Sequence, residues 1–163
     1  MSDNDMVYNP SPTLVPFLTC DNFISLVSGP VGSGKSSAAM MKVAYHAGRM
    51  RASSDGIRRS RAVIVRNTNQ MLTDATIPTF TTWFPEGAAG RYARTDKRFF
   101  LKVDNVECEV LFRGLDDAND VRRLLSLECS FGVLDEYREI HPDIFNALQG
   151  RVGRYPSVAK GGC

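Results

Sequence analysis

Eight consecutive residues, 29–36, combine the residue types that bind a polyphosphate. Their sequence, Gly-Pro-Val-Gly-Ser-Gly-Lys-Ser, matches the phosphate-binding pattern G-x-x-x-x-G-K-[ST] at every fixed position. The three glycines can adopt positive φ, so consecutive backbone N–H groups can turn inward toward an anion. A helix that begins near Ser36 adds the positive end of its dipole. Lys35 can reach the β- and γ-phosphates, and the Ser36 hydroxyl can coordinate Mg²⁺.

The flanking sequence predicts the strand and helix that such a loop connects. Residues 23–27 form an apolar run that predicts a buried strand, and residues 36–49 carry small and apolar side chains at helical spacing. Strand, loop and helix in this order are the context that supports nucleotide binding. The predicted nucleotide-binding residues are Gly29, Pro30, Val31, Gly32, Ser33, Gly34, Lys35, Ser36 and Ser37.

A second motif, at residues 131–136, is an apolar strand that ends in two acids. With a phosphate loop upstream, Asp135 is the predicted partner of Ser36 in holding Mg²⁺, which keeps much of its water shell. Glu136 is then placed to orient and deprotonate an attacking water, as a catalytic residue together with Lys35. This order of strand, Asp and Glu is typical of hydrolysing NTPases. The alternative is that the two acids cap the segment that follows.

Phosphoryl transfer also requires positive charge at the γ-phosphate, which an arginine commonly supplies. We expect the pair Arg122 and Arg123, shortly before the acidic strand, to provide this arginine finger. Most arginines are solvated surface residues, and that is the alternative for each candidate. The other candidates are Arg66, Arg113, Arg151 and Arg154.

The remaining pattern predicts an α/β fold, an open and mainly parallel sheet flanked by helices and a β-hairpin. Ligands of such sheets bind at the carboxyl ends of the strands, where both motifs lie. Pro78 is expected to bend or end the helix that contains it. The further predicted elements are a strand at 62–65, a helix at 68–84, a hairpin at 99–112 that turns at 104–105, a helix at 118–127, a strand at 130–134 and a helix from 141 toward 150.

The composition is that of an ordinary globular protein, with 43% hydrophobic and 23% charged residues in a chain of 163. We expect an irregular N-terminal arm over residues 1–16 and one domain over residues 17–163. The four cysteines are widely spaced, which favours reduced thiols and makes a zinc site improbable. The N-terminus is polar, and no apolar run is long enough for a membrane helix, so we expect an intracellular protein without membrane contact.

The net charge of +2 does not by itself indicate nucleic-acid binding. Residues 48–61, however, contain five arginines and a single acid, Asp55. These arginines could contact DNA phosphates or a neighbouring subunit, or they could belong to a solvated loop. They are Arg49, Arg51, Arg58, Arg59 and Arg61.

Taken together, these motifs resemble the ATPase domain of the large terminase subunit of tailed bacteriophages, the motor that packages DNA. The matching pieces occur in the family's order over nearly the whole chain. They are residues 29–36, residues 63–68 with 79–85, residues 111–116 (Leu-Phe-Arg-Gly-Leu-Asp), residues 133–136 and residues 150–156 (Gly-Arg-Val-Gly-Arg-Tyr-Pro).

The resemblance implies a P-loop NTPase of the additional-strand, RecA-like type, with ATP and Mg²⁺ as cofactors. It also implies double-stranded DNA, a portal protein and a small terminase subunit as partners, and a homo-oligomeric ring in the host cytoplasm, with a monomer expected for the isolated chain. The family's nuclease domain and coupling motif would lie beyond Cys163, so we expect an N-terminal fragment that does not cut DNA. Two alternatives stay open. One is another additional-strand ATPase, such as a helicase or an assembly ATPase, and the other is a nucleotide-binding module without significant turnover.

Overall fold

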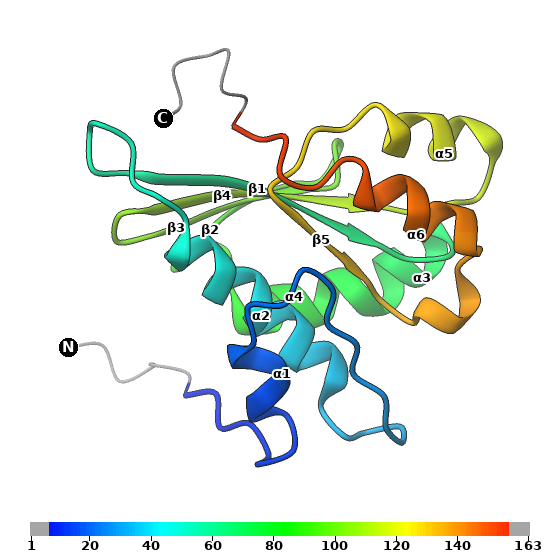
Figure 1. Cartoon of the computed structure of the whole chain (residues 1–163), viewed down its shortest axis with the longest axis horizontal. Helices are drawn as coiled ribbons and strands as arrows, with labels where there is room; N and C mark the ends of the chain where they lie inside the picture. Colours follow the sequence, from blue (N-terminus) through cyan, green and yellow to red (C-terminus); the bar gives the residue numbers. More distant parts are fainter. Residues whose placement is uncertain (1–6, 157–163) are drawn as a thin grey trace.

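A five-stranded sheet organises the computed structural model, which describes residues 7–156 (Figure 1). The strand order is β2-β3-β4-β1-β5, with β1 parallel to both β4 and β5 and with β2, β3 and β4 antiparallel to one another in turn. This confirms the predicted α/β class, with parallel central strands and a hairpin (β3–β4) at their side. The strands are β1 (Arg58–Val65), β2 (Gly90–Ala93), β3 (Arg98–Val103), β4 (Val106–Arg113) and β5 (Phe131–Leu134).

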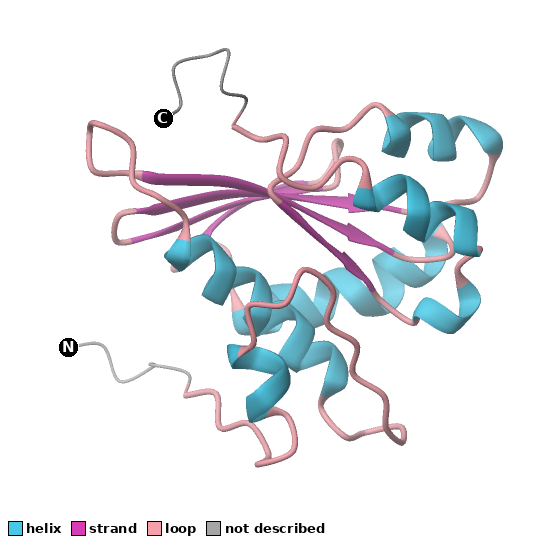
Figure 2. Cartoon of the chain, viewed as in Figure 1, coloured by secondary structure: helices cyan, strands magenta, loops and turns pink. Residues whose placement is uncertain are grey.

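Helices cover both faces of this sheet (Figure 2). On one face, α2 and α4 enclose a core around Met40, Phe80 and Phe112, and on the other, α5 and α6 enclose a core around Leu124 and Leu148. The helical elements are α1 (Val15–Thr19), α2 (Lys35–Arg49), α3 (Asn69–Met71), the π-helical turn η1 (Leu72–Thr76), α4 (Ile77–Trp83), α5 (Ala118–Leu125), the 3-10 turn η2 (Tyr137–Glu139) and α6 (Pro142–Gln149). Helices that sandwich a parallel sheet explain why β1 reads as a continuous apolar run at residues 62–65, all of them fully buried.

Strand β5 depends on a glycine for its contact with α6. A Cβ atom at Gly132 would lie 2.9 Å from Leu148 Cδ2 and 3.3 Å from Val63 Cγ1. Because glycine lacks that atom, the Leu148 side chain of α6 can approach β5 closely. Edge-to-edge pairing with β1 holds the strand whose end carries Asp135.

Residues 69–83 form one continuous helical run, so Pro78 does not end the helix, contrary to one of the two predicted outcomes. The run passes through Pro78 and includes the wider turn η1 immediately before it, in which the Ile77 N–H donates to the Leu72 carbonyl, five residues earlier. An interior proline clashes with the carbonyl four residues before it. The wide turn accommodates Pro78 without ending the helix.

The prediction of a buried strand at residues 23–27 is wrong. These residues are assigned no strand in the structure and follow α1 as an unpaired segment. Phe23, Ile24 and Leu26 are 72%, 50% and 74% exposed. A strand requires backbone partners, and no strand in the described part of the chain pairs with this segment. Its apolar sequence is therefore not matched by burial.

The chain before this segment is held against α2. Helix α1 spans the predicted boundary at residue 16 between arm and domain, and Lys42 of α2 donates hydrogen bonds to the carbonyls of Phe17 and Cys20. Over residues 7–156, no helix combines the length and apolar character that are needed to cross a membrane.

Candidate nucleotide-binding site

The loop at residues 29–36 ends in a helix N-terminus that faces a cleft. Helix α2 begins at Lys35, and Gly34 is its N-cap with φ of 82°, a left-handed conformation that glycine adopts without strain. Gly32 is also left-handed, with φ of 77°. Gly29 is not among the residues with positive φ, but a Cβ atom there would lie 3.2 Å from Ser33 Oγ. The loop therefore needs Gly32 and Gly34 for conformation, whereas a side chain at Gly29 would only crowd the Ser33 hydroxyl.

Lys35 folds back over the loop to which it belongs. Its Nζ donates to the Pro30 carbonyl at 2.7 Å and to Ser33 Oγ at 3.3 Å. The ammonium group therefore lies close to the N-terminus of α2. The positive charge of Lys35 and the positive end of the helix dipole both face the cleft. A phosphate bound at this N-terminus would offer Lys35 charged acceptors in place of its neutral ones.

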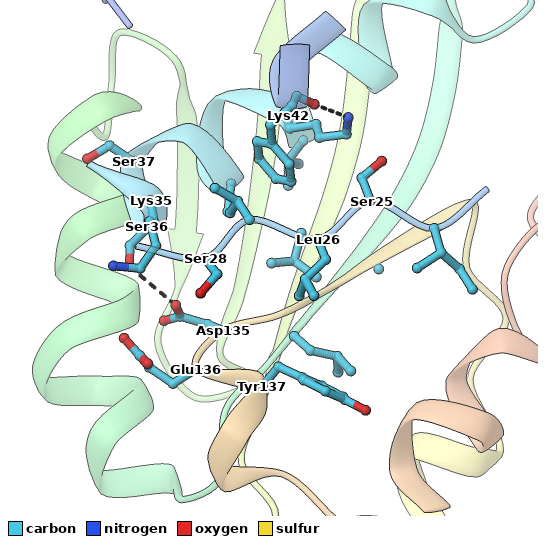
Figure 3. A pocket seen from close by; sticks show the side chains of 18 of the residues that line it. Ser25, Leu26, Ser28, Lys35, Ser36, Ser37, Lys42, Asp135, Glu136 and Tyr137 are labelled. Atoms are coloured by element: carbon cyan, nitrogen blue, oxygen red, sulfur yellow. Dashed lines mark hydrogen bonds between the residues drawn. The ribbon is translucent and has the colours of Figure 1, made fainter. Parts of the chain in front are cut away.

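The two predicted motifs meet at the carboxyl end of β5. Ser36 Oγ donates to Asp135 Oδ1 at 3.3 Å, and Figure 3 shows Asp135 and Glu136 on the side of the cleft where Lys35 and Ser36 lie. Asp135 is only 7% exposed, and its backbone N–H donates to the Val65 carbonyl. Because β5 extends from the buried sheet, its end holds this carboxylate against the loop.

Two further side chains hold Asp135 from the opposite side. Arg66, at the end of β1, donates from Nη1 to Oδ2 at 3.0 Å, and Thr76, in the turn η1, donates to the same oxygen at 2.7 Å. Arg66 also lies 3.9 Å from Glu139. The two oxygens of the Asp135 carboxylate thus have different partners. Oδ2 accepts hydrogen bonds from Arg66 and Thr76, and Oδ1 accepts one from Ser36. Sequence reasoning placed Arg66 among several candidates and missed Thr76.

Glu136 has an unusual backbone conformation. Its φ and ψ are 54° and 56°, a left-handed geometry that residues other than glycine seldom adopt. Its side chain forms no hydrogen bond or ion pair with any residue that the structure describes. Strained conformations of this kind cluster at functional sites, where they aim a side chain. Glu136 is thus a carboxylate beside the phosphate loop that has no hydrogen-bond or ion-pair partner among residues 7–156.

The oxygen atoms at this site suit Mg²⁺. A hydroxyl and a carboxylate oxygen are hard ligands, and Mg²⁺ in nucleotide sites usually takes one or two of them and fills its shell with phosphate and water oxygens. Within residues 7–156, no group of three or more His, Cys, Asp or Glu side chains forms a metal cage. Ser36 and Asp135 would supply two oxygens to a Mg²⁺ ion whose other ligands are phosphate and water oxygens.

The cleft has a volume of about 1100 Å³, enough for a nucleoside triphosphate. The phosphate loop forms one end, and the unpaired segment around Leu26 and the strand β5 form its sides. All the predicted nucleotide-binding residues except Pro30 line it, including Ser37. Arg138, which sequence reasoning did not single out, also lines the cleft. Its position two residues after Glu136 could have indicated it.

The predicted arginine finger lies elsewhere in the described fold. Arg122 and Arg123 belong to α5, neither lines the cleft, and Arg123 forms an exposed ion pair with Asp120 at 3.4 Å. The structure therefore brings Arg66 to the acidic motif and does not bring Arg122 or Arg123 there.

Several arginines of residues 48–61 are paired with acids, most of which lie in other segments. Arg49 pairs with Asp21. Arg59 pairs with Asp55 inside the segment and with Glu107 of β4, and Arg61 pairs with Glu109 of β4. The positive charge that the local sequence suggests is thus partly neutralised in the folded chain.

No protein-family model and no curated protein sequence matches this chain. In structure it is similar to the large terminase from a thermophilic bacteriophage, in two crystal forms of that protein. Crystal form 2 has a TM-score of 0.67 and 15% identity, covering 88% of this chain and 36% of the terminase. Crystal form 3 has a TM-score of 0.62 and 14% identity, covering 88% and 35%. The chain thus spans little more than a third of the terminase's length. At this level of identity the similarity is one of fold, and the chain has the fold of part of a bacteriophage large terminase.

Proposed function

We propose that this chain is a Mg²⁺-dependent ATP-binding and ATP-hydrolysing domain of a phage DNA-packaging motor. The observation that carries the proposal is the contact of 3.3 Å between Ser36 and Asp135, which joins a complete phosphate loop to an acidic strand end. Lys35 and Glu136 flank this contact in the same cleft. The fold similarity to a large terminase supports the motor.

Each residue has a role in this proposal. The backbone N–H groups of the loop and Lys35 hold the β- and γ-phosphates. Ser36 and Asp135 hold Mg²⁺, which neutralises charge on the phosphate oxygens when it is bound. Glu136, with no protein partner among the described residues, orients a water molecule and accepts its proton.

The motor itself is proposed to be a homo-oligomeric ring that acts on double-stranded DNA with a portal protein and a small terminase subunit, in the host cytoplasm. Arg122 and Arg123 lie on α5, away from their own cleft. If either serves as the arginine finger, it acts on the cleft of a neighbouring subunit. Hydrolysis should then rise more steeply than in proportion to protein concentration.

Mg·ATP hydrolysis as a function of protein concentration, with binding of a fluorescent ATP analogue measured in parallel, tests the function. Lys35→Ala should abolish binding. Glu136→Gln should leave the dissociation constant unchanged and lower kcat at least about 100-fold, the usual contribution of a general base. Glu128→Gln, which changes an exposed carboxylate that does not line the cleft, is the matched control and should retain activity. Binding without turnover at any concentration would replace the ATPase with a nucleotide-binding module.

A further inference from the structure

We propose that Thr76 is a positioning residue for Asp135, and that the π-helical turn η1 places it there. This inference rests on the proposed Mg²⁺-nucleotide site. Thr76 is 1% exposed, and its hydroxyl donates to Asp135 Oδ2 at 2.7 Å. By binding Oδ2, Thr76 turns the other carboxylate oxygen, Oδ1, toward Ser36.

The other threonines of the same helical run provide an internal comparison. A threonine in a helix commonly donates its hydroxyl to the carbonyl four residues earlier. Of the other four threonines in the run, Thr73, Thr81 and Thr82 do so, to Asn69, Ile77 and Pro78, whereas Thr79 lines the cleft. The Thr76 hydroxyl instead leaves its own helix and binds a carboxylate 59 residues later in the chain. Its hydrogen bond is therefore one between elements, and it ends on the predicted metal ligand.

The turn η1 offers a reason why Thr76 can make this contact. Five residues, instead of four, separate donor and acceptor where Ile77 N–H bonds to the Leu72 carbonyl. The wider turn offsets the faces of α3 and α4, so Leu72 and Phe80 remain fully buried in the core while Thr76 faces the end of β5. Single π turns of this kind occur frequently at functional sites.

Thr76 and Arg66 both donate to the same oxygen of Asp135, Oδ2, but they contribute differently. Arg66 supplies the charge at Oδ2 through one contact at 3.0 Å, and Ser36 donates to Oδ1 through a longer one at 3.3 Å. Thr76 binds the same oxygen from another element, and together they fix the plane of the carboxylate. Partners that orient a metal ligand in this way commonly change metal affinity 10- to 100-fold when removed.

The test is a Mg²⁺ titration of fluorescent ATP-analogue binding by the full chain. Thr76→Val keeps the shape and removes the hydroxyl, and it should raise the Mg²⁺ concentration for half-maximal binding about tenfold. Binding in EDTA, which needs the phosphate loop but not Asp135, should stay unchanged. Thr76→Ser should restore the wild-type Mg²⁺ requirement. Thr81→Val is the matched control, since its hydroxyl donates within its own helix.

The results separate the positioning role from the proposed function. A Thr76→Val chain with the wild-type Mg²⁺ requirement overturns the positioning role alone. So does equal loss of EDTA binding by the Val and Ser variants, because that marks a packing effect. Wild-type binding that ignores Mg²⁺, or that survives Lys35→Ala, overturns the nucleotide site itself. If the Val variant does not fold, Thr76→Ala provides the same comparison.

Discussion

Replacement of Arg66 by methionine should destabilise the chain strongly, because it leaves a buried carboxylate without its charged partner. The side chains of Arg66 and Asp135 are 13% and 7% exposed, and their ion pair measures 3.0 Å. Methionine keeps much of the length and apolar volume of the arginine stem but carries no charge. The substitution therefore tests the charge more than the packing.

The size of the effect follows from this geometry. At 3.0 Å and an effective dielectric constant of about 20, the attraction is about 5.5 kcal/mol before the cost of desolvation. Removal of one partner of a buried pair typically costs 3–5 kcal/mol. Because Thr76 and Ser36 still donate to Asp135, we expect the lower end, about 3 kcal/mol. For a chain of this size that loss lowers Tm by about 6–12 °C.

Urea unfolding followed by circular dichroism measures this loss, and a double-mutant cycle assigns it. Asp135→Asn removes the charge that Arg66 compensates, so the double variant should be more stable than the two single effects predict, by about 2 kcal/mol. Arg123→Met is the matched control, because its pair with Asp120 is exposed on the arginine side, and it should change stability by less than about 1 kcal/mol. A loss below about 1 kcal/mol for Arg66→Met, or strict additivity in the cycle, would refute the reasoning.

Two other predictions concern the thiols and the core. The Ser25 hydroxyl is the main cause of a lowered pKa at Cys20, whereas burial raises the pKa of Cys108 and of Cys129 to about 11. Of these three thiols, iodoacetamide at pH 8 should therefore modify Cys20 first and the other two only after unfolding, as peptide mass spectrometry can show. Equal labelling of all three in the folded chain would contradict this. Phe80 is fully buried against three other phenylalanine rings, so Phe80→Ala should lower the free energy of unfolding by about 4 kcal/mol in a denaturant titration.

The features that depend on residues close together in the sequence could be predicted from the sequence. The phosphate loop requires residues that are adjacent in sequence, and its spacing predicted the helix that begins at Lys35. The same holds for the β3–β4 hairpin, whose turn at Asp104 and Asn105 joins two neighbouring strands. The proximity of Ser36 and Asp135 was also expected, because both lie at the carboxyl-end edge of the sheet, although the prediction placed Mg²⁺ between them.

The hydrogen-bond partners of Asp135, Arg66 and Thr76, could not be predicted from the sequence. Arg66 was one of several candidates ranked behind Arg122 and Arg123, and its contact with Asp135 depends on β1 and β5 being neighbours in the sheet. Thr76 lay in a segment with a regular helical pattern, and the π turn changes which side chains share a face. A periodicity of 3.6 residues cannot anticipate such a shift.

By itself, the sequence determined the elements whose causes are local: the phosphate loop, the helix after it, the β-branched run of β1, the hairpin and the acids that end β5. The tertiary structure alone decided which distant groups meet. It left residues 23–27 exposed, because an apolar run becomes a buried strand only where another strand supplies its hydrogen bonds. It also paired Arg61 with Glu109 and Arg66 with Asp135. The charge around a side chain depends on its neighbours in space, and the order of residues along the chain does not specify those neighbours.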